Sequence, residues 1–334
     1  MGFHMNKRIV PFILLACLAV PAMAKDIDPS NYKPTDHAHI RRWADIEQAV
    51  WPLLAANTDL CKAQAGYVPG FHAFLSTGSP GMEIYLVGNS SPAEAAGLQV
   101  GDVITSLNGK DVTHKKKGGE AYNEAYARAT KSPNPVRVAF LRDGQINEVS
   151  VSAVPACNIK ILYTGLPIAA GYNEEYQALI LGNHVDLYSS TDDDVRLYLA
   201  RDLAKVFLDH RGQKEKTRKL GGLAATVTSF VTGHNVDADM VPRIWANVKH
   251  GDRQAREADY LGLYLAARAG VDISYAPAFW ERVFANRTGN AGVGRVLGND
   301  PPSPERLEGI RLAAEEILAK QATDQILNPE LPGN

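Results

Sequence analysis

Turn-forming residues constrain the stretch SSPAEAAGLQVGDVITSLNGKDV (90–112) more tightly than any other part of the chain. Ser91-Pro92 is typical of a helix start, and Gly97 suits the left-handed conformation that ends a helix. Gly101-Asp102 turns the chain into an apolar strand, and Asn108-Gly109 favours a hairpin turn. The stretch therefore predicts a short helix, a strand and a hairpin turn, in that order.

This stretch resembles the core of a PDZ domain of the bacterial type. The helical pattern EAYNEAYARA and the hairpin pattern VRVAFLRDG follow in the order that such a domain requires. The resemblance implies a PDZ domain over residues 66–156 that binds an extended peptide or a protein C-terminus by strand addition. It places the binding loop before MEIYLV, with Tyr67, Val68 and Phe71 as candidate peptide-binding residues, although neither GYV nor GF matches the loop of the family.

The first 24 residues have the pattern of a cleaved signal peptide. MNKR is basic, IVPFILLACLAV is apolar, and Ala22-Met23-Ala24 fits the small-residue rule for cleavage. The apolar run is too short for a membrane-spanning helix, and no other stretch of the sequence is long enough. We therefore predict a periplasmic protein without a transmembrane helix. LLAC, ending at Cys17, also resembles a lipoprotein cleavage box, which leaves a lipid-anchored form as the alternative.

Length and charge limit the class of protein. The 334 residues suffice for about two domains, and a net charge of −2 leaves no basic excess to bind nucleic acid. Apolar residues recur at helical spacing within residues 25–65, which predicts an N-terminal helix with a kink or break at Pro52. Residues 157–334 show mostly helical patterns, apart from a short strand predicted at HVDLYSS (184–190). The expected fold class is therefore α+β, with a small β-rich domain before a mostly helical domain.

Two cysteines remain once the signal peptide is removed. Cys61 and Cys157 form an even pair in an exported chain, which favours a disulfide bond, and two separate buried thiols are the alternative. A bond between them would tie the segment before the β-rich domain to the segment after it. In the chain-entropy model, a closed loop of roughly 100 residues stabilises by about 4–5 kcal/mol.

The C-terminal half resembles peptidase family 48 of the metallo class, the HtpX-, BepA- and Oma-like gluzincins, and more narrowly an exported branch that carries a PDZ domain. The resemblance rests on the order and spacing of LLAANTDLC, PAC, VDLYSSTDDDVRLYLARDLAKVFLDH, READYLGLYLAARAGVD, FWERV and PPSPERLEGI. It implies a zincin-like domain over residues 157–334. In active relatives, that domain holds a catalytic zinc ion.

The metal-binding residues of that family are replaced by other residues in this sequence. The family uses two His four residues apart with a Glu between them, and Arg201, Asp202 and Lys205 stand at these positions. The third ligand of the family lies four residues before an Asp, so it corresponds to Ala255, before Asp259. Because Arg and Lys have no lone pair to offer a metal, we expect no zinc, no other cofactor and no catalytic residue.

Other residues provide no replacement site in the sequence. His184, His234 and His250 have no ligand spacing, and His210 lies about half a turn from Arg201, so we expect none to bind metal. Asp300 replaces the His that the family has before PPSPER. No G-x-S-x-G, P-loop or dinucleotide-binding motif is present.

These patterns lead to one principal hypothesis and two alternatives. The principal hypothesis is a periplasmic PDZ plus pseudopeptidase protein that binds or scaffolds envelope proteins or a related active peptidase. The alternatives are a divergent metalloendopeptidase with non-standard ligands and an inhibitor or regulator of another protease.

The degenerate positions also predict an ion pair. A buried carboxylate needs a partner, so we expect Arg201, with or without Lys205, to bind Asp259 across two facing helices. The alternative is that both cations pair with Asp202 and Asp209 on their own helix.

Overall fold

The computed structural model describes residues 37–76, 78–114, 117–168, 170–175, 177–208, 253–289 and 303–331. Its α-helices are α1 (His37–Ala56), α2 (Pro92–Ala95), α3 (Gly118–Ala129), α4 (His184–Tyr188), α5 (Asp192–Phe207), α8 (Arg253–Arg268), α9 (Ala276–Gly289) and α11 (Pro304–Ala322), with a 3₁₀ turn, η3 (Ile273–Tyr275). Its strands are β1 (Ala65–Val68), β2 (Phe71–Leu75), β3 (Met82–Val87), β4 (Val103–Leu107), β5 (Lys110–Asp111), β6 (Val136–Arg142), β7 (Gln145–Val151), β8 (Val154–Cys157), β9 (Lys160–Tyr163), β10 (Gly171–Asn173) and β11 (Ala178–Leu181). The predicted signal peptide, including Cys17, lies outside the described residues.

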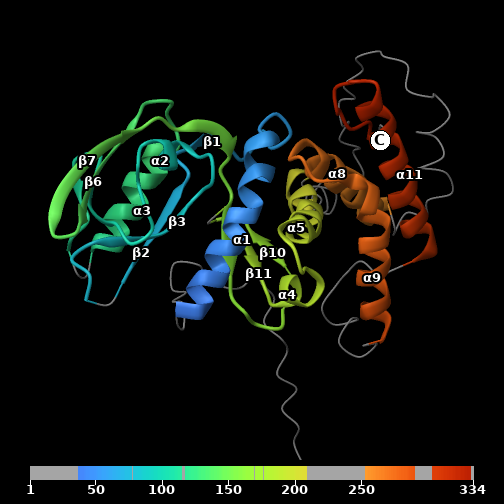
Figure 1. Cartoon of the computed structure of the whole chain (residues 1–334), viewed down its shortest axis with the longest axis horizontal. Helices are drawn as coiled ribbons and strands as arrows, with labels where there is room; N and C mark the ends of the chain where they lie inside the picture. The colour runs from blue at the N-terminus through green and yellow to red at the C-terminus, as the bar shows by residue number, and fades with distance from the viewer. Residues whose placement is uncertain are drawn as a thin grey trace, which may run out of the picture.

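The β-rich unit is a sheet in the order β2-β3-β4-β6-β7, with β5 paired to β4 and helices α2 and α3 packed on it (Figure 1). The predicted turns are present. The Ser91 side chain caps α2, and Gly97 follows the helix with a φ of 82°. Asn108 and Gly109 both have positive φ between β4 and β5, as a two-residue hairpin turn of the primed type requires.

The helical unit contains a small sheet and five of the described α-helices. Strand β11 is central in this sheet, with β10 antiparallel on one side and β9 parallel on the other. Helices α5, α8, α9 and α11 gather beyond this sheet, while α4 lies close to it (Figure 1). The observed fold thus confirms the α+β class, with a β-rich unit before a largely helical region.

One local prediction was wrong. HVDLYSS was expected to be a strand, but residues His184–Tyr188 form the one-turn helix α4. Val185 is the one buried residue of α4. The alternation of apolar and polar residues that suggested a strand therefore does not reflect one buried face of a sheet. The turn brings Asp186 to Tyr163 and Arg42, and it places Ser190 directly before the N-cap of α5.

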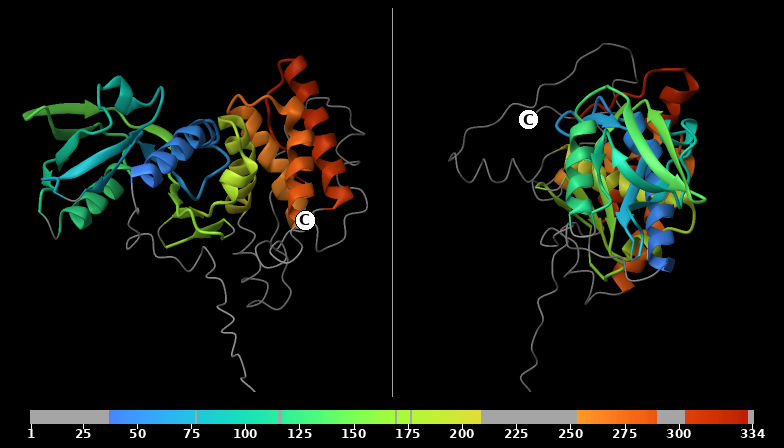
Figure 2. Two further views of the ribbon diagram at one scale, coloured as in Figure 1. Left: turned by 60° about the horizontal axis from the view of Figure 1, so that its bottom comes forward. Right: turned by 90° about the vertical axis from the view of Figure 1, so that its left-hand side faces the viewer.

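Helix α1 lies between the two units (Figures 1 and 2). It continues through Pro52 to Ala56, so this proline does not break it. On one side, Glu47 accepts hydrogen bonds from the His72 ring in the β-rich unit, with both distances 3.0 Å. On the other side, the Trp43 indole donates to the carbonyl of Ile161 at 2.7 Å. One helix therefore contacts both units with specific polar bonds as well as apolar side chains.

A disulfide bond joins the segments that flank the β-rich unit. Cys61 and Cys157 are bonded, with their Cα atoms 5.9 Å apart, which confirms the predicted pairing. Immediately beside the bond, β1 and β8 form an antiparallel two-stranded ribbon in which Ala65 faces Cys157. Both sulfur atoms are buried in the same apolar core as α1 and α5. The bond therefore closes the base of the β-rich unit onto the helical unit.

Reduction of this bond should destabilise the protein. The bond closes a loop with a sequence separation of 96 residues. The chain-entropy model gives about 4–5 kcal/mol for a loop of this length, because the open unfolded chain gains conformational freedom. We expect denaturant unfolding of the oxidised protein to require a clearly higher urea concentration than unfolding of the reduced protein. A double variant, Cys61→Ala with Cys157→Ala, is the control and should not respond to reductant. Equal unfolding midpoints for oxidised and reduced protein would contradict this prediction.

Candidate functional site

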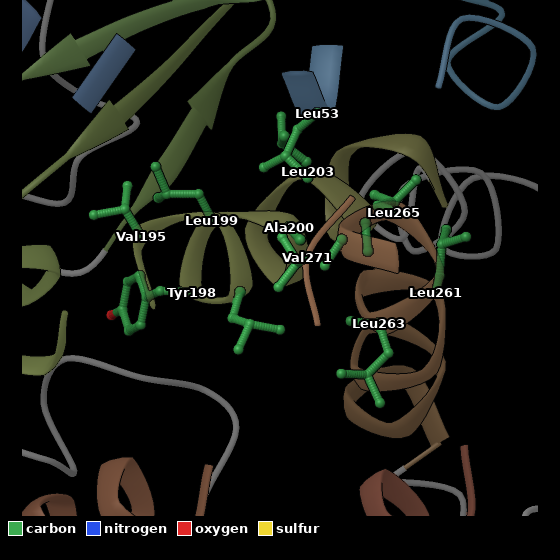
Figure 3. Packing of buried hydrophobic residues seen from close by; sticks show 14 of the residues in the cluster. Leu53, Val195, Tyr198, Leu199, Ala200, Leu203, Leu261, Leu263, Leu265 and Val271 are labelled. Carbon is green, nitrogen blue, oxygen red and sulfur yellow. The ribbon is translucent and has the colours of Figure 1, made fainter. Parts of the chain in front are cut away.

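The candidate site in the helical unit forms where α5 and α8 cross. The Thr191 hydroxyl caps α5 by accepting from the Asp194 amide, and three Asp residues in the first turn suit the positive end of the helix dipole. Apolar side chains of α5 and α8 then interlock, among them Ala200, Leu203 and Leu265 (Figure 3). The packing brings the polar residues of the two helices into direct contact.

A glycine allows this close crossing. A Cβ atom added at Gly262 of α8 would lie 2.9 Å from the Cα atom of Arg201 and 3.0 Å from its nitrogen. Any larger residue would therefore separate the helices. The close approach places the backbone of Arg201 against Gly262, which lies about one helical turn after Asp259 on α8.

Asp259 is the centre of the site. Its Oδ1 atom lies 2.5 Å from Nε of Arg201, so α5 and α8 are joined by an ion pair. Arg306 of α11 binds the same carboxylate with two atoms, Nε at 2.8 Å from Oδ2 and Nη2 at 2.8 Å from Oδ1. All three side chains are buried, and Arg306 is only 1% exposed. Two guanidinium groups from different helices thus neutralise and orient one buried carboxylate.

Aromatic rings of α9 cover the two guanidinium groups. The Cζ atom of Arg201 lies 5.9 Å from the ring centroid of Trp280, and that of Arg306 lies 4.7 Å from the centroid of Phe284. A cation over an aromatic face is stabilised by the ring quadrupole, and more so when water is excluded. Four helices, α5, α8, α9 and α11, therefore meet around one carboxylate.

Two opposing effects act on the pKa of Asp259. Burial raises the pKa because it disfavours the charged carboxylate, while Arg306 and Arg201 lower it by charge and by hydrogen bonds. The arginines prevail, and the pKa lies below its ordinary value. Asp259 is therefore ionised at neutral pH despite its burial.

The structure brings together only some of the residues named from the sequence. Arg201 binds Asp259 between helices, whereas Nζ of Lys205 lies 3.3 Å from Asp202 on its own helix. Ala255 is buried on α8, one turn before Asp259. Asp209, His210, His234, His250 and Asp300 lie outside the described residues.

Arg306 was missed by sequence reasoning. Ser303 caps α11 and Pro304 starts it, so the helix-start pattern SPER fixes Arg306 in the first turn. Nothing in that pattern shows which carboxylate the first turn faces, because Arg306 lies 47 residues after Asp259. The one sequence signal that could have indicated this pairing was the positive charge of Arg306 in the first turn of a predicted helix.

The side chains at the site do not fit a zinc ion. Arg201 and Lys205 offer no lone pair near neutral pH, Ala255 has no donor atom, and Asp259 is bound by two cations. Within the described ranges, no group of three or more His, Cys, Asp or Glu side chains is placed to hold a metal ion. His39 and His184 instead contact Tyr163 and Tyr188, respectively.

The three candidate peptide-binding residues of the β-rich unit occupy different environments. Tyr67 and Val68 belong to β1, where they face Pro155 and Val154 of β8. Phe71 starts β2 and is fully buried in the core of the unit. Their arrangement does not present three exposed side chains to a ligand. β2, like β7, lies at an edge of the sheet, so one of its edges has no strand partner among the described residues.

Loss of the Asp259 charge should strongly destabilise the helical unit. Asp259→Asn leaves two buried guanidinium groups without their anion, and breaking such a pair typically costs about 3–5 kcal/mol. Asp59→Asn is the matched control, because Asp59 also lies 2.5 Å from an arginine, Arg268, but is more than half exposed. Exposed pairs contribute about 0–1 kcal/mol, so the control should unfold almost like the wild type. Equal unfolding free energies for the two variants would refute a dominant role for Asp259.

Acid should remove the same stabilisation. The pKa of Asp259 is lower in the folded protein than in the unfolded chain, so its contribution is complete above the ordinary carboxyl pKa of about 4 and is lost as the pH falls through the folded value. We expect the gap in unfolding free energy between the wild type and Asp259→Asn to narrow below roughly pH 4. Denaturant unfolding of both proteins at a series of pH values measures this gap. A constant gap would show that folding leaves the pKa of Asp259 unchanged and would contradict this prediction.

Comparison with known proteins places the β-rich unit in a family. Residues 69–153 match the family model described as a PDZ domain. Among solved structures, a serine endoprotease from Yersinia pestis matches with 24% identity and a TM-score of 0.21, over 27% of this chain and 29% of that chain. No curated protein matches the chain in sequence. The chain therefore contains a PDZ domain, followed by a largely helical region.

Proposed function

We propose that this chain is an exported protein-binding scaffold in which a PDZ domain is joined to a pseudopeptidase domain. The PDZ domain supports the binding function, because domains of this family bind peptides and protein C-termini. The partners proposed are envelope proteins or a related active peptidase. The proposal assigns the helical unit a role in holding or presenting partners, without zinc-dependent cleavage.

The ion cluster at Asp259 carries the pseudopeptidase part of the proposal. Under the resemblance to family 48, Arg201 and Lys205 occupy the positions of two zinc-binding His residues, and Ala255 occupies that of the third ligand. Arg201 supplies positive charge beside Asp259, as a zinc ion would in an active relative, and Arg306 supplies more. A cation that is part of the chain thus replaces a bound one, and the four helices need no metal to meet at this point.

The proposal places the protein in the periplasm. The disulfide bond between Cys61 and Cys157 is compatible with an oxidising compartment, where such bonds persist. In the described residues, no helix is long and apolar enough to cross a membrane. The pattern of the first 24 residues supplies the export signal in this proposal.

Zinc content and casein hydrolysis test the proposal directly. We expect far less than one zinc per chain in the purified exported protein, and no hydrolysis of casein that a chelator inhibits. One tightly held zinc per chain together with chelator-sensitive hydrolysis would instead establish the divergent metallopeptidase. Inhibition of another protease by stoichiometric protein would favour the third hypothesis.

Restoring the family residues is the sharper experiment. A variant with Arg201→His, Asp202→Glu, Lys205→His and Ala255→Glu should gain about one zinc per chain, because two His and one Glu then lie on facing helices. The matched control keeps Ala255 and should bind zinc more weakly, since it has one ligand fewer. Circular dichroism first establishes that both variants fold. A folded four-residue variant that binds no more zinc than the control would refute the positional match.

A further inference from the structure

The free edge of the PDZ sheet is the natural place for a peptide to bind. β2 is an edge strand, and only its inner edge pairs with a strand, β3. In an antiparallel pair, residues two apart direct their backbone groups to the same edge. The ladder with β3 skips Tyr85 of that strand, so the alternation along β2 is preserved, and Phe71 and Ala73 share its outer edge. An extended peptide would pair with these groups by strand addition.

Tyr126 of α3 already forms a hydrogen bond with one of these backbone groups. Its hydroxyl donates to the carbonyl oxygen of Phe71 at 3.2 Å. The two rings also pack edge to face, with centroids 5.8 Å apart. Both side chains are buried, so α3 lies directly against the start of β2. The carbonyl that an incoming peptide amide would find is therefore bonded and covered.

Tyr122, one turn earlier on α3, occupies the next group. Burial raises the pKa of Tyr122, and a hydrogen bond from the Ala73 backbone acts in the opposite direction. A bond that lowers the pKa of a phenol stabilises the anion, so the donor is the Ala73 amide. Tyr122 is 5% exposed. Tyr122 and Tyr126 thus satisfy one donor and one acceptor on the same edge.

The loop before β2 has few amides left for a carboxylate. The amide of Tyr67 donates to the carbonyl of Thr130, just after α3, at 2.8 Å. Pro69 has no amide hydrogen, and its carbonyl accepts from Ala93 at the start of α2. These contacts hold the loop against both helices of the domain. The capture of a terminal carboxylate would need backbone amides that point outward from this loop.

We infer that the peptide-binding edge of this PDZ domain is closed by its own helix, with Tyr122 and Tyr126 capping the backbone groups of β2 that an extended peptide must use. The inference rests on the proposed binding function. A peptide exchanges each tyrosine hydroxyl bond for one backbone bond, so the exchange adds little, and the apparent affinity falls by the fraction of open molecules. The domain therefore binds weakly until α3 moves away from β2.

Helix α1 reinforces the closed form through the His72 ring. Its buried Glu47 accepts from the His72 ring at 3.0 Å, and a hydrogen bond links Glu47 to Tyr85 of β3. The His72 ring in turn packs on the ring of Tyr126.

Thr105 belongs to β4, which does not pair with β2, and its hydroxyl donates to the backbone carbonyl of Ala139 at 3.2 Å. Thr105→Val therefore removes a hydroxyl bond elsewhere in the same sheet and is a matched control.

Amide hydrogen exchange on the full-length oxidised chain tests the cap without any ligand. We expect the Ala73 amide to be protected although it lies on a sheet edge. Tyr122→Phe should speed its exchange by at least tenfold, and Thr105→Val should leave it almost unchanged. Fast exchange of Ala73 in the wild type, or equal effects of the two variants, would overturn the inference.

Peptide binding then tests the consequence. The probe is an immobilised array of decapeptides with free carboxyl ends and each of the twenty residues at the last position. We expect the folded double variant, Tyr122→Phe with Tyr126→Phe, to bind apolar-ended peptides at least fivefold more tightly than the wild type, whereas Thr105→Val does not. Wild-type binding as tight as that of the double variant would overturn the closed edge but leave the binding function intact. If the Ala73 exchange depends on Tyr122 and no protein binds any peptide, both the gating role and peptide binding at this edge fail.

Discussion

Burial of the Asp259 carboxylate is the constraint on which the helical unit depends. A lone carboxylate at this depth would protonate or unfold its surroundings, so its neighbours must supply positive charge in fixed positions. Arg201 does so from α5 and Arg306 from α11, and the aromatic rings of α9 pack over both. If α5, α8 or α11 moved out of this arrangement, at least one buried charge among Arg201, Asp259 and Arg306 would lose a partner. The cluster therefore specifies how the helices meet, beyond what their apolar faces require.

The two units are joined by a different set of contacts. Helix α1 bonds to β2 through Glu47 and to β9 through Trp43, and the Nε of Arg196 in α5 donates to the carbonyl of Ala49 at 2.9 Å. The disulfide bond then fixes the ends of the PDZ domain to the core that contains α1. The PDZ domain is consequently fixed to the helical unit, because α1 and the disulfide bond both connect it to the same apolar core.

Sequence reasoning succeeded where structure is determined locally. The positive φ values of Gly97, Gly101 and Gly109 follow from turn chemistry that each short stretch carries within itself. The disulfide bond followed from cysteine count and position. Sequence reasoning failed for residues 184–188, because a single helical turn is too short to show the helical period of apolar residues.

The tertiary partners at the two sites were predictable only in part. The pairing of Arg201 with Asp259 was expected because the resemblance seen in the sequence implied that two helices face each other. Arg306 was not expected, since no local pattern links α11 to that carboxylate. The tyrosine caps were also missed, because EAYNEAYARA predicts a helix with two tyrosines but not the strand edge that they reach. Contacts between distant segments depend on the whole fold, which local periodicity does not contain.

Both sites share one physical feature under the functions proposed here. At Asp259, guanidinium groups of the chain provide the positive charge that a metal would provide, and at β2, tyrosine hydroxyls provide the hydrogen bonds that a peptide would provide. The two replacements differ in strength, because an arginine remains charged throughout the ordinary pH range while a neutral hydroxyl bond is easily exchanged for another. The ion cluster is therefore suited to a permanent structural role, and the tyrosine pair to a contact that a partner can displace. This difference assigns stability to the helical unit and recognition to the PDZ domain.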